Sequence, residues 1–156
     1  MILPKLGRLS TDQAIGSATA EDSENVIYLG TDEDVPDDLW LEIVNKVTVS
    51  GTGALTIDLI LSTVSTLDTS TVKVMSIVIA SEADKRIATA GAHVLGCTLP
   101  REVRELAKAL SYDYLGLIYT PTSTLALTLD AAISMSKPRT KDAAQVTRSN
   151  VGVPTA

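Results

Sequence analysis

Two long stretches of the chain alternate between apolar and more polar positions, and the first runs from Leu39 to Leu61. Its apolar residues are Leu39, Leu41, Ile43, Val47 and Val49 in the first half and Leu55, Ile57, Leu59 and Leu61 in the second. A period of two places each set on one face of a β-strand. Between them lies Ser50-Gly51-Thr52-Gly53, whose glycines can adopt the positive φ of a turn. The segment is therefore predicted to be a β-hairpin, with a register that pairs Val47 with Leu55, Ile43 with Leu59 and Leu41 with Leu61.

The second stretch, from Tyr114 to Met135, predicts another hairpin. Its strands cover residues 114–120 and 124–135, joined by a turn at Pro121-Thr122-Ser123. The inward positions of the later strand are Leu125, Leu127, Leu129, Ala131, Ile133 and Met135. Shorter runs at 26–29, 72–80 and 92–99 predict further strands. We expect the two hairpins to pack against each other as the layers of a sandwich.

One segment has the pattern of a helix. Pro100 can begin a helix, and the apolar residues of about 101–109 and the next turn share one side: Val103, Leu106, Ala107 and Leu110. Several short strands without a β-α-β rhythm indicate an all-β protein with a jelly-roll or β-sandwich fold. The predicted organisation is an N-terminal arm at 1–24, a sandwich core at 25–136 and a basic, extended C-terminal tail at 137–156.

Composition narrows the class of protein. The 156 residues suit one domain, and because Phe is absent and aromatic residues make up 3%, the core must consist of Leu, Val, Ile and Ala. A net charge of −6 argues against nucleic acid or an anionic membrane as a partner. A single cysteine excludes an intrachain disulfide and fits synthesis in a reducing cytoplasm. The start of the chain does not resemble a signal peptide, and the longest uncharged run, residues 114–129, is too short for a membrane span.

The sequence contains few groups that could form a catalytic centre. His93 and Cys97 are four residues apart on a predicted strand, so their Cα atoms are ~13 Å apart and they cannot form a dyad within that strand. Asp58 and Asp130 fall on outward faces, where we expect solvated carboxylates. No nucleotide-binding, hydrolase or metalloprotease motif is present. We predict that the protein is not an enzyme and needs no cofactor or metal.

Two features leave alternatives open. The acidic loop at 31–38 could supply oxygen ligands to Ca²⁺, but it lacks the EF-hand spacing, and a solvated loop is the preferred interpretation. Trp40 and Tyr28 could form a platform that stacks on a sugar. Trp40 lies on the face opposite the apolar set of its strand, and we expect it to pack beneath the N-terminal arm or at a subunit contact.

Four segments resemble those of a family of tailed-phage capsid cement proteins. These are an S-x-x-Q-A stretch at Ser10 to Ala14, a V-I-x-L-G strand at Val26 to Gly30, a Y-L-x-L-x-Y strand at Tyr114 to Tyr119, and the last strand at Thr124 to Ser134. The resemblance covers about residues 5–136. Two features depart from the family pattern: the helical segment from Pro100 to Leu110, and the basic tail after Lys137.

The resemblance implies a jelly-roll protein of the virion that binds the outer face of an icosahedral head and bridges major capsid subunits. It implies the major capsid protein and further copies of the chain, as a dimer or trimer, as partners. The residues we expect at capsid or subunit contacts are Leu6, Leu9, Ile15, Trp40, Lys137, Arg139, Lys141 and Arg148. The basic tail is predicted to dock on an acidic surface, with a solvated tail as the alternative. A carbohydrate- or receptor-binding module on the phage surface is the alternative function.

Overall fold

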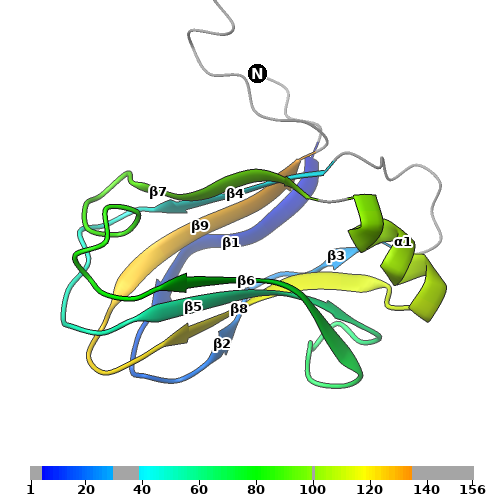
Figure 1. Cartoon of the computed structure of the whole chain (residues 1–156), viewed down its shortest axis with the longest axis horizontal. Coiled ribbons are helices and arrows are strands. Elements are labelled where there is room, and N and C mark those ends of the chain that lie inside the picture. The colour runs from blue at the N-terminus through cyan, green and yellow to red at the C-terminus, as the bar shows by residue number, and fades with distance from the viewer. Residues whose placement is uncertain (1–4, 30–38, 100, 135–156) are drawn as a thin grey trace, which may run out of the picture.

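The protein is an antiparallel β-sandwich with one short helix (Figure 1). The computed structural model describes residues 5–29, 39–99 and 101–134, and the side chains of residues 5, 6, 101 and 102 lie outside that description. Sheet A has the strand order β1-β9-β4-β7 and sheet B the order β2-β8-β5-β6, with β3 also pairing with β8. The all-β sandwich predicted from the sequence is therefore confirmed.

The bounds of β3 to β9 agree closely with the predicted runs, whereas β1 and β2 lie within the predicted N-terminal arm. Sheet A contains β1 (Lys5–Ile15), β9 (Leu127–Ser134), β4 (Leu39–Asn45) and β7 (His93–Leu99). Sheet B contains β2 (Glu21–Asp22), β3 (Ile27–Tyr28), β8 (Tyr114–Pro121), β5 (Leu55–Ser62) and β6 (Thr71–Ile79). The connections β4–β5, β6–β7 and β8–β9 each pass from one sheet to the other, which is the topology of a jelly roll.

Neither of the two predicted hairpins forms. β4 pairs with β7 and β9, while β5 pairs with β6 and β8, so β4 and β5 face each other across the core. The predicted pairs of Val47 with Leu55, Ile43 with Leu59 and Leu41 with Leu61 are wrong, and β8 and β9 are likewise in different sheets. Alternation of apolar residues reports which face of a strand is buried, but it does not report which strand is the neighbour. A connection long enough to cross the ~10 Å between layers satisfies the same pattern.

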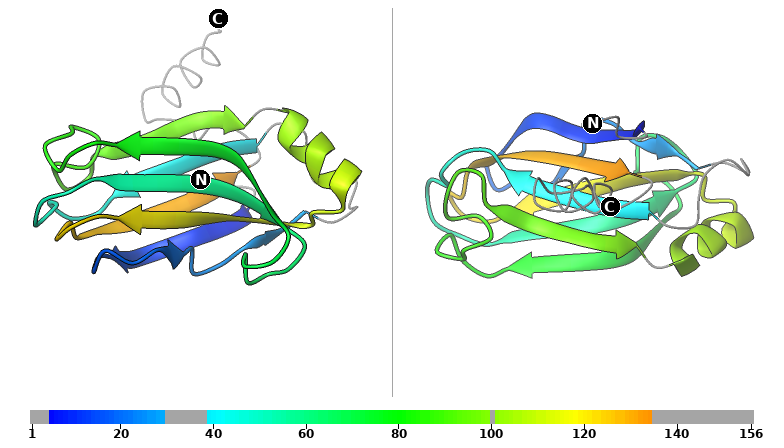
Figure 2. Two further views of the ribbon diagram at one scale, coloured as in Figure 1. Left: turned by 60° about the horizontal axis from the view of Figure 1, so that its bottom comes forward. Right: turned by 90° about the horizontal axis from the view of Figure 1, so that it is seen from above.

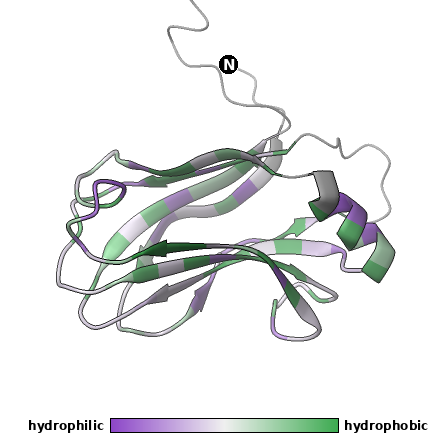
Figure 3. Cartoon of the chain, viewed as in Figure 1, coloured by the Kyte–Doolittle hydropathy of each residue, from purple (hydrophilic) through white to green (hydrophobic). Residues whose placement is uncertain are grey.

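The strands of the two predicted segments do lie next to each other, but in different pairs: β4 pairs with β9 and β5 pairs with β8. Leu41 and Ile43 of β4 are in register with Ile133 and Ala131 of β9, and Leu59 of β5 is in register with Leu117 of β8. These side chains have almost no exposed surface and belong to one continuous core. The apolar faces predicted for β4, β5, β8 and β9 are therefore confirmed, although their pairing is different. Val47, also predicted on the core face, lies beyond the end of β4 and is 40% exposed. Figure 3 shows apolar residues along both sheets and a hydrophilic stretch in the loop between β6 and β7.

Two connections close one end of the sandwich. Residues 50–54, between β4 and β5, run antiparallel to residues 122–126, between β8 and β9, and they continue the strand ladders around the end. The backbone nitrogens of Ser50, Thr124 and Thr122 donate to the carbonyls of Ala126, Thr52 and Ala54 over 2.9, 3.0 and 2.9 Å. Gly51 has φ +73°, and a Cβ there would overlap the carbonyl oxygen of Thr124. The glycine predicted for a hairpin turn is thus needed for the close approach of two crossing connections.

The predicted N-terminal arm is largely part of the sandwich. β1 forms an edge of sheet A by pairing with β9, so the core begins at Lys5 and not at residue 25. Three register shifts interrupt the β1 ladder, and Gly7 and Asp12 have positive φ. These bulges break the period-two pattern, which explains why the sequence did not predict a strand here.

Helix α1 (Arg101–Leu110) confirms the predicted helical segment. Val103 and Ala107 are buried in the core, whereas Leu110, predicted on the same side, is 47% exposed. The helix ends in a reverse turn at Ser111, which has φ +57°: the Tyr112 nitrogen donates to the Ala107 carbonyl and the Ser111 nitrogen to the Lys108 carbonyl. This turn ends the helix directly after Leu110 and directs the chain back into β8.

Candidate interaction surfaces

Trp40 lies on the outer face of sheet A. Its neighbours in β4, Leu39 and Leu41, point into the core, so the alternation of the strand turns the indole outward, where it is half-buried. The ring covers Gly96 of β7, since a Cβ at that position would lie 3.1 Å from Trp40 Cζ2. The absence of a side chain at Gly96 therefore makes room for the indole. The prediction that Trp40 faces away from the core is confirmed.

The two ends of the described fold meet beside Trp40. Lys5, at the start of β1, is in register with Ser134, at the end of β9, and Ser134 is in register with Trp40. Thr98 of β7 completes the same row on the other side of Trp40. We call this row, together with Gly96, the Trp40 corner. The segment that carries Lys137, Arg139, Lys141 and Arg148 follows Ser134 directly in the sequence.

Ion pairs occupy the rest of the same face. Lys46 Nζ lies 3.2 Å from Asp130 Oδ2 and 3.7 Å from Asp12 Oδ1, and the hydrogen bond with Asp130 raises the pKa of Lys46. Burial opposes ionisation of Asp130, but its hydrogen bonds with the Asp12 nitrogen and Lys46 hold its pKa below the usual value. Glu42 Oε1 lies 3.3 Å from Nδ1 of the exposed His93, a contact that is an ion pair only when the imidazole is protonated. The large aromatic Trp40 is the distinguishing feature of this otherwise polar face.

Two of the predicted contact residues are core residues. Leu9 is 0% exposed and Ile15 is 1% exposed, so neither side chain is available to a capsid subunit or another copy. The sequence predicts both residues in an arm, whereas β1 turns them toward sheet B. The side chain of Leu6 lies outside the described residues, as do Lys137, Arg139, Lys141 and Arg148. The acidic loop considered for Ca²⁺ also lies outside them.

Asp58, on the outer face of sheet B, is paired rather than solvated. Asp58 is 9% exposed; its carboxylate lies 2.9 Å from Lys73 Nζ and accepts a 2.6 Å hydrogen bond from Ser76. The expectation that Asp58 is a solvated carboxylate is therefore wrong. Burial, with a contribution from Asp68, raises the pKa of Asp22 on the same face. Hydrogen bonds from Thr66 and Thr69 lower the pKa of Asp68.

The sugar-stacking platform of Trp40 and Tyr28, considered as an alternative, does not form. Trp40 belongs to the outer face of sheet A, whereas Tyr28 is in β3 and lies on the outer face of sheet B. Tyr28 pairs instead with Tyr114 of β8, with 5.3 Å between ring centroids and 56° between ring planes. Tyr28 is 61% exposed, so this pair forms an aromatic surface feature that sequence spacing did not reveal.

A buried hydrogen-bond network joins two of the motifs that carry the family resemblance. Ser10 Oγ donates to Gln13 Oε1 over 2.6 Å and lies 2.8 Å from the Tyr119 hydroxyl. Gln13 Nε2 donates to the carbonyl of Asp22 over 2.7 Å. Ser10 and Gln13 come from the S-x-x-Q-A stretch, and Tyr119 ends the Y-L-x-L-x-Y strand. These motif residues therefore build the scaffold and do not form a binding surface.

The described residues do not assemble a catalytic centre from His93 and Cys97. His93 points outward to Glu42, whereas Cys97 is in register with the core residue Leu41 and burial raises the pKa of its thiol. A raised thiol pKa reduces the fraction of nucleophilic thiolate. Among the described residues, no group of three or more His, Cys, Asp or Glu could hold a metal ion. No helix in the described ranges is long and apolar enough to cross a membrane.

The fold and its surfaces define the class of the protein as an antiparallel β-sandwich of jelly-roll topology, with a half-buried tryptophan beside the first and last strands of the described fold. No protein-family model matches the chain, and no curated protein matches its sequence. A functional assignment therefore depends on the surfaces described above, because a jelly-roll fold hosts many unrelated functions.

Proposed function

We propose that the protein is a capsid decoration, or cement, protein that binds the outer face of an icosahedral phage head and bridges neighbouring major capsid subunits. The observation that carries the proposal is the Trp40 corner, where both ends of the described fold meet in one row of sheet A. Leu6, a predicted contact residue, directly follows Lys5 in the sequence. The basic predicted contact residues, Lys137, Arg139, Lys141 and Arg148, follow Ser134. The proposal is supported by the neighbouring positions of Lys5 and Ser134 on one sheet, where the described fold begins and ends.

The proposed role is structural and requires no catalysis. A weak contact at the Trp40 corner gains strength when it is repeated across a lattice, because each additional attachment becomes an intramolecular event. A partly exposed aromatic side chain flanked by small residues, here Gly96, Thr98 and Ser134, provides a contact with a large apolar area. The proposed partners are the major capsid protein and further copies of the chain, and the proposed location is the outer surface of the virion.

Co-sedimentation tests this proposal directly. The full chain should pellet with phage heads that lack their decoration protein, saturate at a fixed number of copies per head, and slow the disruption of those heads by heat or chelator. Bovine serum albumin at the same concentration serves as a control for trapping in the pellet. Recovery of the chain in the supernatant with mature heads, under conditions where it is folded, overturns the proposal.

A second candidate function rests on a different observation. The Tyr28–Tyr114 pair is an exposed aromatic feature on sheet B, and aromatic faces stack on sugar rings. A carbohydrate-binding role predicts signals on a glycan array that disappear in a Tyr28→Ala variant and persist in a Trp40→Ala variant. Head binding that depends on Trp40, together with an array without signals, favours the capsid role.

A further inference from the structure

One long side of the sandwich ends in two strand edges, β6 and β7, which Figure 2 shows at the same side of the molecule. Within the described ranges, β6 pairs with β5 and β7 pairs with β4, and neither has a second neighbour. Unpaired backbone groups of an edge strand are a template for another strand, so proteins normally protect such edges. The two edges differ in this respect.

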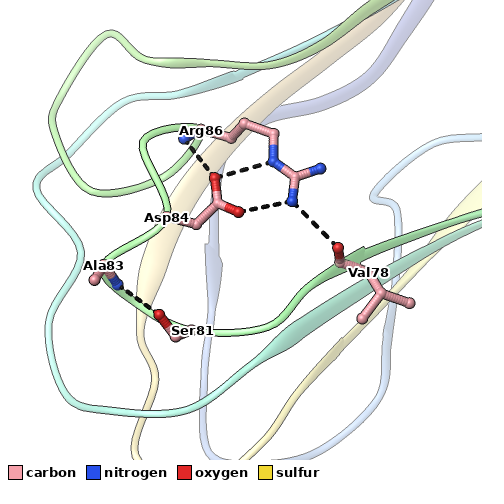
Figure 4. Close-up of polar contacts among 5 residues, drawn as sticks. All are labelled: Val78, Ser81, Ala83, Asp84 and Arg86. Carbon is pink, nitrogen blue, oxygen red and sulfur yellow. Dashed lines mark hydrogen bonds and ion pairs between the residues drawn. The ribbon is translucent and has the colours of Figure 1, made fainter.

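The edge of β6 carries two protective features. A register shift between Leu59 and Ile60 leaves Val74 as an extra residue, which interrupts the regular edge. Near the other end, Arg86 Nη2 donates to the carbonyl of Val78 over 3.2 Å, and Asp84 fixes the guanidinium through contacts of 2.7 and 3.0 Å (Figure 4). A fixed charge against a strand edge disfavours the approach of another strand.

The edge of β7 is regular and uncharged over residues 95–99. Its register shift lies at the start of the strand, between the pairs of Ile43 and Val44, and does not reach this part. Residues 95–99 contain neither a charged residue nor proline. The core-facing residues Leu95 and Cys97 are only half-buried, although their partners Ile43 and Leu41 are 0% exposed. The core therefore reaches the surface along the unprotected edge.

We propose that residues 95–99 of β7 pair antiparallel with the same residues of a second copy, which would make sheet A continuous across a homodimer. These observations favour a second copy of the chain as the partner of this edge. The segment is uncharged, so two copies do not repel each other, and it has leucine at both ends, Leu95 and Leu99, with Cys97 at the centre. A twofold axis at Cys97 places Leu95 opposite Leu99 of the other copy and keeps core-facing residues on the same face. The proposed dimer forms in the free chain, so its test does not depend on whether the protein binds a capsid.

Charge-swap variants of the full chain test the pairing by analytical ultracentrifugation. The wild type should sediment as a dimer of the 16.4 kDa chain. Cys97→Glu and Cys97→Lys each place like charges opposite each other across the axis, and each should weaken the dimer by about a hundredfold. A mixture of the two variants should form dimers again, because Glu then faces Lys. This recovery also establishes that both variants are folded.

The matched controls are Ile77→Glu and Ile77→Lys, which change a half-buried, core-facing residue on the protected β6 edge. Both should remain dimeric. If the Cys97 variants do not fold, Thr98→Lys, at an exposed position on the same edge, should still weaken the dimer. A monomeric wild type, a dimer unaffected by the changes at Cys97 and Thr98, or a dimer lost in the Ile77 variants with unchanged folding overturns the proposal.

Discussion

The side-chain oxygens of Ser10 and Tyr119 lie 2.8 Å apart and join the two sheets through the core. Ser10 gives its one hydroxyl proton to Gln13, so the Tyr119 hydroxyl acts as donor to Ser10. Replacing Tyr119 with Phe leaves Ser10 without this buried donor and should reduce the free energy of unfolding by about 1–2 kcal/mol. Urea denaturation measures the change. Tyr28→Phe, at an exposed position, is the control and should have little effect, and an unchanged midpoint in Tyr119→Phe would contradict the role of the network.

The same tyrosine makes stability depend on pH in alkaline solution. Burial raises the pKa of Tyr119 above its ordinary value of 10.0. The folded state therefore keeps a proton that the unfolded state loses, and the contribution to stability is complete below the ordinary pKa and declines as the pH rises above it. Denaturation midpoints measured from pH 8 to 11 should fall less steeply in Tyr119→Phe than in the wild type. Parallel curves would contradict this expectation.

Alanine substitutions at two glycines with similar φ values distinguish the cost of backbone strain from the cost of steric overlap. Gly91 has φ +82°, and a Cβ added there would have no heavy atom within 4 Å, so Gly91→Ala should cost about 1 kcal/mol from conformation alone. Gly51 has φ +73°, and a Cβ would overlap the Thr124 carbonyl oxygen, so Gly51→Ala should cost roughly 3 kcal/mol or more. Thermal unfolding of the two variants gives the comparison, and equal losses would be inconsistent with the close packing of the connections.

Asp84 should contribute to stability in acid. The hydrogen bonds from Arg86 lower the pKa of Asp84 from 3.8 to about 2. Because the folded state holds the ionised form more strongly, this contribution is present above the unfolded value near 3.8 and is lost as the pH falls toward about 2. Both side chains remain partly exposed to solvent, so the effect should be small and sensitive to salt. Asp84→Asn should flatten the dependence of the unfolding midpoint between pH 4 and 2, and an unaltered slope would argue against the pair.

Trp40→Ala tests the proposed capsid contact. Removing a half-buried aromatic side chain from the outer face should weaken binding to heads by about tenfold or more, as expected for an aromatic anchor at an interface. Tyr28→Ala removes an aromatic side chain from the opposite face of the sandwich and serves as the matched control. Circular dichroism verifies that both variants are folded. Equal binding by the two variants would place the contact elsewhere.

Deletion of residues 137–156 tests the basic tail. The deleted segment carries Lys137, Arg139, Lys141 and Arg148 against Asp142, so binding to an acidic surface should weaken most at low ionic strength. At high salt the full chain and the truncated chain should bind heads alike, because counterions screen the attraction. Occupancy on heads measured at both ionic strengths gives the comparison. A deletion without effect at any salt concentration would favour a solvated tail.

The sequence predicts which strand faces are buried more reliably than it predicts which strands pair. The odd-numbered faces of β4 and β5 are in the core as expected, because a period of two directly reports which side of a strand is apolar. The predicted strand pairing is wrong. Two consecutive strands bury the same apolar faces whether their connection is a hairpin within one sheet or a crossing from one sheet to the other. Leu9 and Ile15 were assigned to an arm because bulges displace them from a strict alternation. The predicted outward face of Trp40 is correct. The Tyr28–Tyr114 pair does not follow from sequence spacing, because it joins strands far apart in the sequence.

The pairing of Lys5 with Ser134 has a consequence for chain connectivity. A short linker between these two positions would close the described chain into a ring, and the exposed turn at residues 17–20 offers a place to open it. Such a circular permutant would retain every strand ladder of both sheets while moving its termini to the opposite end of the sandwich. The permutant would keep every core side chain, so a loss of head binding without a loss of folding would be due to the changed position of the termini.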